Sequence, residues 1–589
     1  PSWQLLVDDY VVDRWRNLVR FLNTPKSQQI VMRPSNPRKE ARFGCPCSVW
    51  QARGNRSFKL YHSSGQVAGS TYRYTEWPKA MRVASSADGL EWGTANQAEP
   101  LTFDSGAVGM TGTFTAVNQY GKTHLSGYEG ANSKACLARS TDGQTWTTIP
   151  TGQARVGDPE HLRKQRRRSA KTGGTDPKTP LHLTRSKFNL RSNRVAVRAC
   201  AQGIHTCMRN GTGWGHGAMM VCLVNLLDAA KLENAECVRI LTAWAEVRKV
   251  DCTDGSRSRL GRAADAYVQP LFDGRRQLVW YRRDFGGPGG WREIRGVQVV
   301  EVNASINDGL NSLRDDPLTN VGSYYLDRMG KLERFRRQIY TLSFTRRSKN
   351  LWLGLMTVIE WAKDMGEAVG PQSPSFKRDT TNVYLVTSRD GIHIDDEWVY
   401  AQRPLLSKGK LQSDWNSGFV LPAAQIVSDK DGAETRVYFE ARRVRHEERF
   451  NEAATIGMAS WQFDRLAGLR AADPASDAVF TTKPFLAKGS NLGLLLNAGV
   501  PAGCSGVVRT EMVRDDGEGG AALGVVNLPL NKRAFERSRS GNRVRVGWRA
   551  GALAGKQDVV SVAPNATIRL RFTLRGSARL YAFRVIWPA

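Results

Sequence analysis

Acidic residues are scarce in this chain relative to basic ones. Its 589 residues include 55 Asp and Glu but 85 Lys and Arg, which gives a formal net charge of +30. A field of this sign attracts polyanions such as acidic polysaccharides, nucleic acids or anionic surfaces. The chain contains no helix-turn-helix, RNP, KH or zinc-finger pattern, so nucleic acid is not the partner we expect.

Long apolar runs are also absent. The longest one, AMMVCLVNLLDAA (218–230), contains an Asn and an Asp and is too short to cross a bilayer. Long helical periodicities are scarce, whereas Gly (56) and Trp (17) are plentiful and apolar residues make up 41% of the chain. This composition favours a large core made of many short strands joined by turns, and the length suggests more than one domain.

The nine cysteines are odd in number and scattered, which excludes a small disulfide scaffold. Five of them lie between residues 200 and 252, where one or two bridges are plausible in an oxidising compartment. No zinc-site spacing is met, and we expect no metal and no cofactor. Glycosylation sequons begin at Asn55, Asn210, Asn303 and Asn565. Together with the cysteines they indicate a secreted protein, and because no signal peptide precedes Pro1 we interpret the chain as a mature form.

Three short repeats form the clearest local pattern. SSADGLEW (85–92) is nearly repeated by RSTDGQTW (139–146), and its first half returns in TSRDGIHI (387–394). The Asp can accept backbone N–H groups across a turn, the Gly can adopt the left-handed conformation and the Ser can add a local bond. The Trp can wedge between neighbouring sheets. Asp88 and Asp142 are 54 residues apart, about one propeller blade, so we interpret the motif as a structural staple repeated once per blade.

Further strand pairs are expected at 266–285, 339–359 and 419–443. From residue 476 the pattern changes, and 507–526, 543–551 and 566–587 suggest a compact sandwich. Residues 151–260 fit this plan worst. This segment is strongly basic around RKQRRR (163–168), and its stretch 224–247 could form either a helix or two strands.

Several longer stretches resemble a known family. In chain order they are QLLVDDYVVD (4–13), GGWREIRGVQVV (289–300), VTSRDGIHIDDEWVYAQRPLL (386–406), SDWNSGFVLPA (413–423), TTKPF (481–485) with LLLNA (494–498), and IRLRFTLRGSARLYAFRV (568–585). Their order and wording resemble large secreted proteins similar to glycosyl hydrolase family 32. The resemblance implies an all-β fold: a five-bladed β-propeller over 1–473, with a basic insertion at about 151–260, followed by a β-sandwich over 474–589. It also implies a carbohydrate site in the funnel at the propeller axis.

Hydrolysis of a glycoside normally needs two carboxyl groups across the scissile bond. In family 32 the nucleophile lies in an Asn-Asp-Pro motif of the first blade, but the matching stretch ARFGCPCSVW (41–50) has no carboxylate. The Arg-Asp-Pro and Glu-Cys motifs of the family have partial counterparts in Arg283-Asp284-Phe285 and Glu236-Cys237. By strand position the better catalytic candidates are Asp265, Glu293, Asp414 and Glu440, although each can also be a turn or ion-pair carboxylate.

Arginines and aromatic residues supply a second signal. The predicted substrate-binding residues are Arg282, Arg283, Arg292, Arg295, Trp415 and Arg442. Guanidinium forks suit sulfate and carboxylate groups, and Trp415 can stack on a sugar ring. Trp280, Tyr281 and Trp291 can supply a further stacking face, unless they are core aromatics.

These observations predict a secreted, glycoside-hydrolase-like protein that acts on or binds an acidic, sulfated or uronic, polysaccharide in the propeller funnel. The alternative is a non-catalytic extracellular protein that uses the propeller as a glycan-binding or structural module. The missing first-blade Asp keeps this alternative open.

Overall fold

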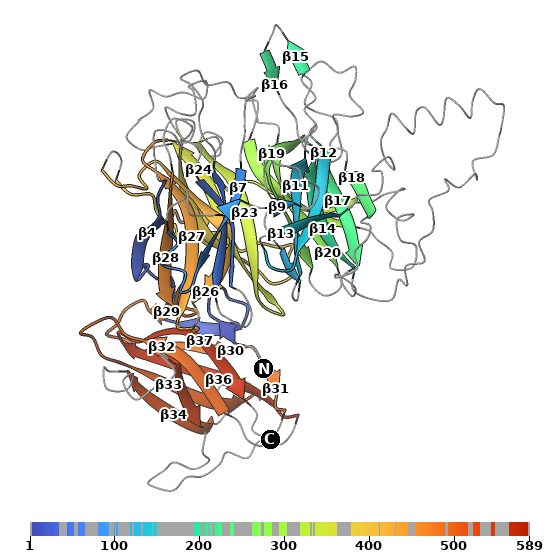
Figure 1. Cartoon of the computed structure of the whole chain (residues 1–589). Helices are drawn as coiled ribbons and strands as arrows, with labels where there is room; N and C mark the ends of the chain where they lie inside the picture. Colours follow the sequence, from blue (N-terminus) through green and yellow to red (C-terminus); the bar gives the residue numbers. More distant parts are fainter. Residues whose placement is uncertain are drawn as a thin grey trace, which may run out of the picture.

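The computed structural model of this protein is built almost entirely from β-strands, arranged in two parts that lie end to end (Figure 1). It describes residues 3–586 apart from 35–43, 52–56, 65–79, 94–98, 101, 104–117, 121–122, 131–133, 144, 150–193, 202–206, 210–211, 215–217, 226–235, 241–261, 273–275, 286–293, 303–317, 330–332, 334–335, 362–378, 411–412, 430, 446–453, 489–492, 516–521, 531–542 and 548–564. The predicted all-β class, with propeller-type sheets followed by a β-sandwich, is confirmed. Within the described ranges, no helix is long and apolar enough to cross a membrane.

Among the described residues the larger part contains seven sheets, and the five numbered 1 to 5 here are built mainly from strands that follow one another in the chain. Sheet 1 contains β5 (Gly44–Gln51), β6 (Phe58–Ser64), β7 (Ala80–Ser86) and β8 (Glu99–Pro100). Sheet 2 contains β10 (Asn118–Tyr120), β11 (Thr123–Gly130), β12 (Lys134–Ser140), β13 (Thr145–Ile149) and, parallel to β13, β9 (Thr102–Phe103). Sheet 3 contains β19 (Arg262–Phe272), β20 (Gln277–Phe285), β21 (Ile294–Val302) and β22 (Leu318–Tyr324).

Sheets 4 and 5 are each extended at the outer edge by residues from another part of the chain. Sheet 4 contains β23 (Arg337–Ser348), β24 (Leu351–Trp361) and β25 (Asp379–Ser388), and Leu406 bridges to Val383 at its outer edge after the single helical turn α5 (Glu397–Tyr400). Sheet 5 contains β26 (Phe419–Ser428), β27 (Glu434–Arg442), β28 (Thr455–Gln462) and the N-terminal strand β4 (Ser27–Met32). The start of the chain therefore completes the last sheet.

Residues 151–260, the segment that fitted the predicted blade pattern worst, also contain strands. β14 (Arg194–Ala201), β17 (Ala218–Asn225) and β18 (Glu236–Ile240) form a three-stranded sheet, and β15 (Cys207–Arg209) pairs with β16 (Thr212–Trp214). β14 contacts β11 and β12 of sheet 2 and β19 of sheet 3. Within the ambiguous stretch 224–247 the structure describes residues 224–225 and 236–240. Both pieces belong to strands. The register of β17 and β18 places Cys222 opposite Cys237, but disulfide pairing stays a prediction.

The smaller part is a sandwich of two six-stranded sheets. One contains β3 (Leu18–Leu22), β29 (Ala467–Ala471), β37 (Arg579–Ile586), β32 (Gly493–Gly499) and β35 (Arg543–Gly547), with β1 (Gln4–Leu5) beside β37. The other contains β2 (Val12–Arg16), β30 (Ala478–Thr482), β36 (Thr567–Gly576), β33 (Gly506–Arg514) and β34 (Ala522–Leu530), with β31 (Phe485–Leu486) beside β36. The N-terminal strands in these sheets are a feature that the sequence analysis missed.

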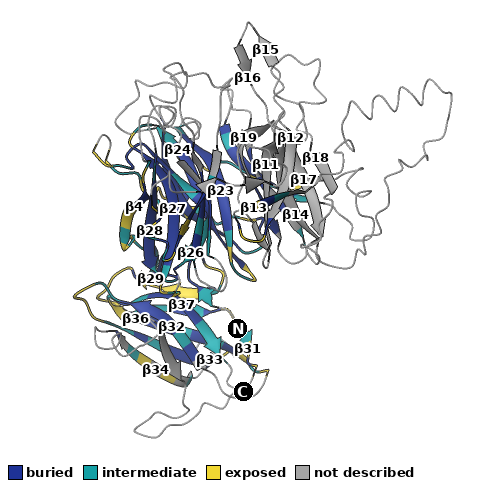
Figure 2. Ribbon diagram, in the orientation of Figure 1, coloured by how far each residue is buried: buried dark blue, intermediate teal, exposed yellow. Residues whose placement is uncertain are grey.

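Alternation of apolar and polar residues explains why the C-terminal strands pack as a sandwich. In β36, Ile568, Leu570 and Phe572 are fully buried, whereas the arginines between them point to the opposite face. Phe572 stacks on Phe480, with 4.8 Å between the ring centroids, and lies 5.2 Å from Phe583. Figure 2 shows the resulting buried layer inside both parts of the molecule.

The three Ser-x-Asp-Gly repeats form the same turn each time. In the first, Gly89 N donates to Ser86 Oγ (2.9 Å), and the N–H groups of Leu90 and Glu91 donate to Asp88 Oδ1 (2.8 and 3.2 Å). Gly89, Gly143 and Gly391 have φ values of 78°, 78° and 76°, the left-handed region that favours glycine. The predicted turn chemistry is confirmed.

Each turn is also held by the sheet before it. Tyr438 Oη in sheet 5 donates to Gly89 O in sheet 1 (2.6 Å), and Tyr61 Oη in sheet 1 donates to Gly143 O in sheet 2 (2.7 Å). The third repeat lacks the Trp, and there Trp280 Nε1 of sheet 3 donates to the Gly391 carbonyl of sheet 4 (2.8 Å). The turns therefore join neighbouring sheets as well as closing hairpins.

The third turn also ties the larger part to the N-terminal segment. Arg389, the variable residue of that repeat, donates from Nε and Nη2 to the two carboxylate oxygens of buried Asp8 (2.8 and 2.7 Å). Its guanidinium lies 4.4 Å from the centre of the Tyr10 ring. Asp8 lies between β1 and β2, which belong to the two sandwich sheets. This paired guanidinium therefore anchors the sandwich to sheet 4.

Replacing Gly89 by Ala tests the joint between sheets 5 and 1. An added Cβ would lie 2.5 Å from Tyr438 Oη, so the substitution combines backbone strain with loss of the Tyr438 bond. The control is Gly432→Ala, because Gly432 also has a positive φ (67°) but has open space around it. We expect Gly432→Ala to cost about 1–2 kcal/mol of unfolding free energy and Gly89→Ala clearly more, measured by urea denaturation. Equal costs would show that the contact between the sheets is unimportant.

The third turn should weaken at acid pH. Burial acts to raise the pKa of Asp390, but hydrogen bonds from the His393 side chain and from the N–H groups of Ile392 and His393 outweigh it and lower this pKa. The carboxylate therefore stabilises the fold above the pKa of the unfolded chain, and this contribution is lost as the pH falls through the lower, folded pKa. We expect Asp390→Asn to lower the melting temperature at pH 7 and to reduce its dependence on pH between 5 and 3. An unchanged dependence on pH would contradict this assignment.

Candidate functional site

The five sheets have two chemically different ends. The end that carries the Ser-x-Asp-Gly turns is called the turn end, and it faces the sandwich through Arg389 and Asp8. The opposite end is called the charged end, because β20, β24 and β27 finish there with charged side chains near Phe285, Trp361 and Arg442. Strands of about ten residues span roughly 30 Å, so groups at the two ends do not act together.

Between sheets 5 and 1, the apolar layer gives way to polar groups at the charged end. Leu60 and Tyr438 belong to the core between these sheets. His62 and Glu440 lie on the same faces of β6 and β27, two residues nearer the C-terminal end of each strand. His62 is 0% exposed and Glu440 is 4% exposed. Glu440 Oε1 accepts a hydrogen bond from Arg442 Nε at 2.6 Å. Buried charges of this kind need partners and gather at functional sites, so this layer marks the end of the sheets that chemistry would use.

The same change occurs between sheets 3 and 4. Trp280 and Val358 are in the core, and two residues further along lie Arg282 and Glu360. The guanidinium of Arg282, which is 5% exposed, lies 5.1 Å from the centre of the Tyr340 ring. This distance is within the range of a cation–π contact. Trp280 itself is fully buried, so the interpretation of it as a sugar-stacking residue is wrong and the core interpretation is right.

Glu360, whose side chain is 16% exposed, is a carboxylate that the sequence analysis missed. It accepts hydrogen bonds from Arg337 Nη2 (2.9 Å), Tyr384 Oη (2.5 Å) and Asn382 Nδ2 (2.6 Å). Burial acts to lower the pKa of Arg337, but the charge of Glu360 outweighs it and raises this pKa. Burial and the Glu360 charge together raise the pKa of Tyr384. The signal was present in TVIEW (357–361), where an acid ends an apolar strand as Glu440 does in β27.

The predicted site residues other than Asp414, Trp415 and Asn565 fall into three groups. Arg282, Arg295, Glu440 and Arg442 lie at the charged end. Asp265 and Arg283 lie on β19 and β20 near that end, where the register pairs Ala263 with Arg283, but their side chains lie outside the described residues. Glu293 and Arg292 lie entirely outside the described residues, as do Asn55, Asn210 and Asn303. The catalytic and binding roles stay predictions.

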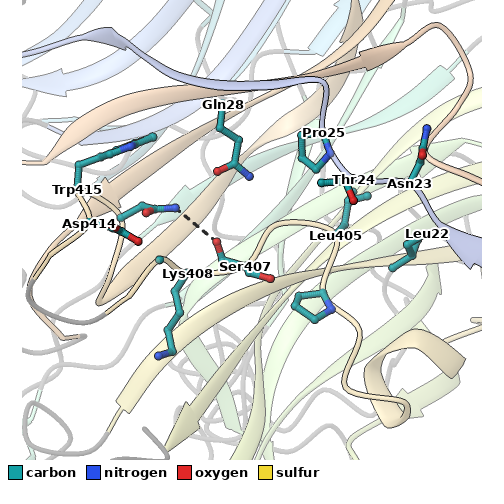
Figure 3. A pocket seen from close by; sticks show the side chains of 13 residues that line it. Leu22, Asn23, Thr24, Pro25, Gln28, Leu405, Ser407, Lys408, Asp414 and Trp415 are labelled. Carbon is teal, nitrogen blue, oxygen red and sulfur yellow. Dashed lines mark hydrogen bonds between the residues drawn. The ribbon is translucent and has the colours of Figure 1, made fainter. Parts of the chain in front are cut away.

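Asp414 and Trp415 form a separate group in the loop before β26. Asp414 accepts hydrogen bonds from Lys410 N (2.6 Å) and Ser413 Oγ (3.3 Å), so its carboxylate organises its own loop. Trp415 stacks on Phe439, with 5.6 Å between centroids and 20° between planes. Both residues line a pocket of about 530 Å³ at the outer edge of sheets 4 and 5 (Figure 3).

Glu440 and Glu360 do not form a hydrolytic pair. Glu440 lies on the face of sheet 5 that packs on sheet 1, and Glu360 lies on the face of sheet 4 that packs on sheet 3. Sheets 4 and 5 themselves pack about 10 Å apart, and both carboxylates lie beyond that gap. Carboxyl groups that act on one glycosidic bond are about 5–9.5 Å apart. Glu440 would therefore need another partner, and the other catalytic candidates that the sequence predicts are Asp265, Glu293 and Asp414.

Replacing Glu360 tests its role as a fixed, paired anion. We expect Glu360→Leu to cost about 3–5 kcal/mol, because it leaves the Arg337 charge buried and unpaired. Glu360→Gln, which keeps hydrogen-bonding capacity, should cost less, and the double variant Arg337→Met, Glu360→Leu should recover part of the loss. Chemical denaturation measures all three, with the exposed pair Arg575–Asp477 as the control in which Asp477→Ala has little effect. A double variant no more stable than Glu360→Leu would exclude coupling.

No protein-family model matches the chain, and no curated protein matches it. Solved structures similar to it include a family 32 β-fructofuranosidase variant of Bombyx mori in complex with sucrose, at 11% identity, with 93% of each chain covered and a TM-score of 0.29. An exo-β-1,3-galactanase of Phanerochaete chrysosporium has 9% identity, 95% coverage of this chain and 100% of its own, and a TM-score of 0.25. An α-L-arabinofuranosidase of Clostridium thermocellum has 11% identity, 59% and 91% coverage, and a TM-score of 0.26.

Proposed function

We propose that this protein is a secreted, glycoside-hydrolase-like protein that binds an acidic, sulfated or uronic, polysaccharide at the charged end of its sheets. The observation that carries the proposal is the excess of guanidinium groups over carboxylates among the described side chains at that end. The arginines are Arg82, Arg282, Arg295, Arg336, Arg337, Arg442, Arg443 and Arg445. The acids are Glu333, Glu360, Asp379 and Glu440.

Geometry supports anion recognition as well as charge does. Arg336 lies over the Trp361 ring, 5.3 Å from its centre, as Arg282 lies over Tyr340. An arginine stacked on an aromatic ring has its orientation fixed, which lowers the entropy cost of binding a sulfate or carboxylate with its fork. The net charge of +30 would draw such a chain toward this end before contact.

Binding without hydrolysis is the form of this function that the residues favour. β5, the first strand of sheet 1, carries no carboxylate between Gly44 and Gln51. Glu440 is held by Arg442, and Glu360 is held by Arg337, Tyr384 and Asn382. Glycoside hydrolysis stays the second candidate, since Glu440 is buried at the charged end and Asp265 lies on a strand of sheet 3 near the same end.

Secretion and N-glycosylation belong to the same proposal. Asn565 is exposed and adopts a φ of 65° in the turn before β36, so its side chain is accessible to a modifying enzyme. In protein made through a eukaryotic secretory pathway, a smaller loss of mass on enzymatic deglycosylation of Asn565→Gln than of the wild-type protein would test this site.

Affinity columns test the main proposal. We expect retention on heparin or alginate that weakens with salt, and no retention on the neutral fructan levan, because screening reduces ionic attraction. Arg336→Gln should elute at lower salt than Arg575→Gln, a control that removes the same charge from an exposed site on the sandwich. Identical elution of the two variants would place the binding elsewhere. Retention on levan equal to that on heparin would contradict an acidic ligand.

Release of reducing ends separates hydrolysis from binding. If Glu440 and Asp265 act together, Glu440→Gln and Asp265→Asn each abolish release with little change in melting temperature. If the protein only binds, no acidic polysaccharide yields reducing ends, although retention on the columns persists. Release that both variants leave unchanged would remove these residues as catalysts.

A further inference from the structure

The pocket beside Trp415 has no role in the proposed function. It is formed by three segments that are far apart in the sequence: 22–28 between β3 and β4, 404–409 after α5, and 414–416 before β26. Its volume of about 530 Å³ is in the range of small-molecule sites, roughly 300–1,000 Å³. Figure 3 shows Gln28, Asp414 and Trp415 around the same opening.

Sheet 5 separates this pocket from the charged layer that contains Glu440. Side chains of β27 alternate between the two faces, so Phe439, on which Trp415 stacks, points away from Glu440. Phe439 belongs to the core between sheets 4 and 5, whereas Tyr438, on the Glu440 face, belongs to the core beside sheet 1. A ligand in this pocket therefore does not touch the Glu440–Arg442 pair.

Trp415 is a rigid platform in the pocket wall. Phe439 covers one face of the indole, and the far end of the ring lies against Gly457, where an added Cβ would be 2.4 Å from it. The pocket therefore meets the other face or the edge of a ring that is already fixed. Aromatic rings held in this way bind the C–H faces of sugars without losing side-chain freedom on binding.

The remaining lining is polar and close to electrically neutral. Gln28 and Ser407 are exposed and offer an amide and a hydroxyl group, and Asp414 offers a carboxylate. Lys408 is the single cationic residue among the lining residues, so the pocket lacks the arginine excess of the charged end. An apolar ring face with amide, hydroxyl and carboxylate groups beside it matches a ring that carries hydroxyl groups and no charge.

We propose that this pocket binds one uncharged sugar unit of a neutral glycan. It is a second carbohydrate site that differs from the charged end in location, in the sheet face that forms it and in the charge of its ligand. A neutral unit held at the edge of sheets 4 and 5 would leave the charged end free. The pocket therefore does not depend on the acidic-polysaccharide proposal.

Titration with defined neutral oligosaccharides tests the pocket. The probes are the hexasaccharides of cellulose, xylan, starch, β-1,3-galactan and inulin, observed by saturation-transfer NMR and by tryptophan fluorescence at millimolar concentrations. At least one should bind the wild-type protein in a saturable way. Binding should fall at least tenfold in Trp415→Ala and severalfold in Gln28→Ala, and it should be unchanged in Trp15→Ala, which removes a Trp that is 63% exposed on the sandwich.

Gln28→Ala keeps the test valid if Trp415→Ala destabilises the fold, because Gln28 is exposed and lies on an outer strand. Heparin retention should be unaffected by both pocket variants, so failure of this proposal and failure of the acidic-glycan proposal give different results. The pocket proposal is overturned if none of the five probes binds the wild-type protein. It is also overturned if Gln28→Ala and Trp15→Ala bind equally well.

Discussion

The hydrogen bond to the Gly carbonyl of each Ser-x-Asp-Gly turn is the interaction on which the arrangement of the sheets depends. It joins sheets 5 and 1, sheets 1 and 2, and sheets 3 and 4. Apolar faces attract one another without fixing how far one sheet slides along the next. A tyrosine or tryptophan donor from the preceding sheet bonds this carbonyl at 2.6–2.8 Å and so fixes the sliding position. Burial raises the pKa of Tyr61 and Tyr438, which keeps both phenols protonated as donors. The turn end is thereby held, and the charged end is left for other chemistry.

Because the turn end is fixed, the alternation of side chains between the two faces of each strand decides which residues lie at the charged end. Tyr438 and Val358 pack in apolar layers, and the same strand faces continue to Glu440 and Glu360. Charges buried between sheets cost free energy unless they are paired, and both glutamates are paired. A fold that needed only stability would have continued the apolar layer. The charged layer therefore indicates a function at this end.

The sequence predicted the features that depend on residues close together in the chain. Ser, Asp and Gly within four residues define the turns, and alternation in 339–359 and 419–443 located the strands β23, β24, β26 and β27. Partners far away in the chain escaped it. Tyr438 lies 349 residues from Gly89, and nothing local pairs them. Trp280 was open to two interpretations because a Trp in an alternating strand has the same pattern whether its face meets a core or a ligand.

The pocket beside Trp415 and the Glu440–Arg442 pair depend on one strand register. Phe439 supports the pocket wall and Glu440 supplies the charged layer, and these adjacent residues point to opposite faces of β27. A slip of β27 by a single residue would exchange the two faces, so that Glu440 and Arg442 would both turn toward Trp415 and Phe439 would turn toward sheet 1. Tyr438, which directly precedes these two residues in the chain, is the residue whose hydroxyl bonds the Gly89 carbonyl. The turn that joins sheets 5 and 1 thus also fixes which face of β27 holds charge and which supports an aromatic platform.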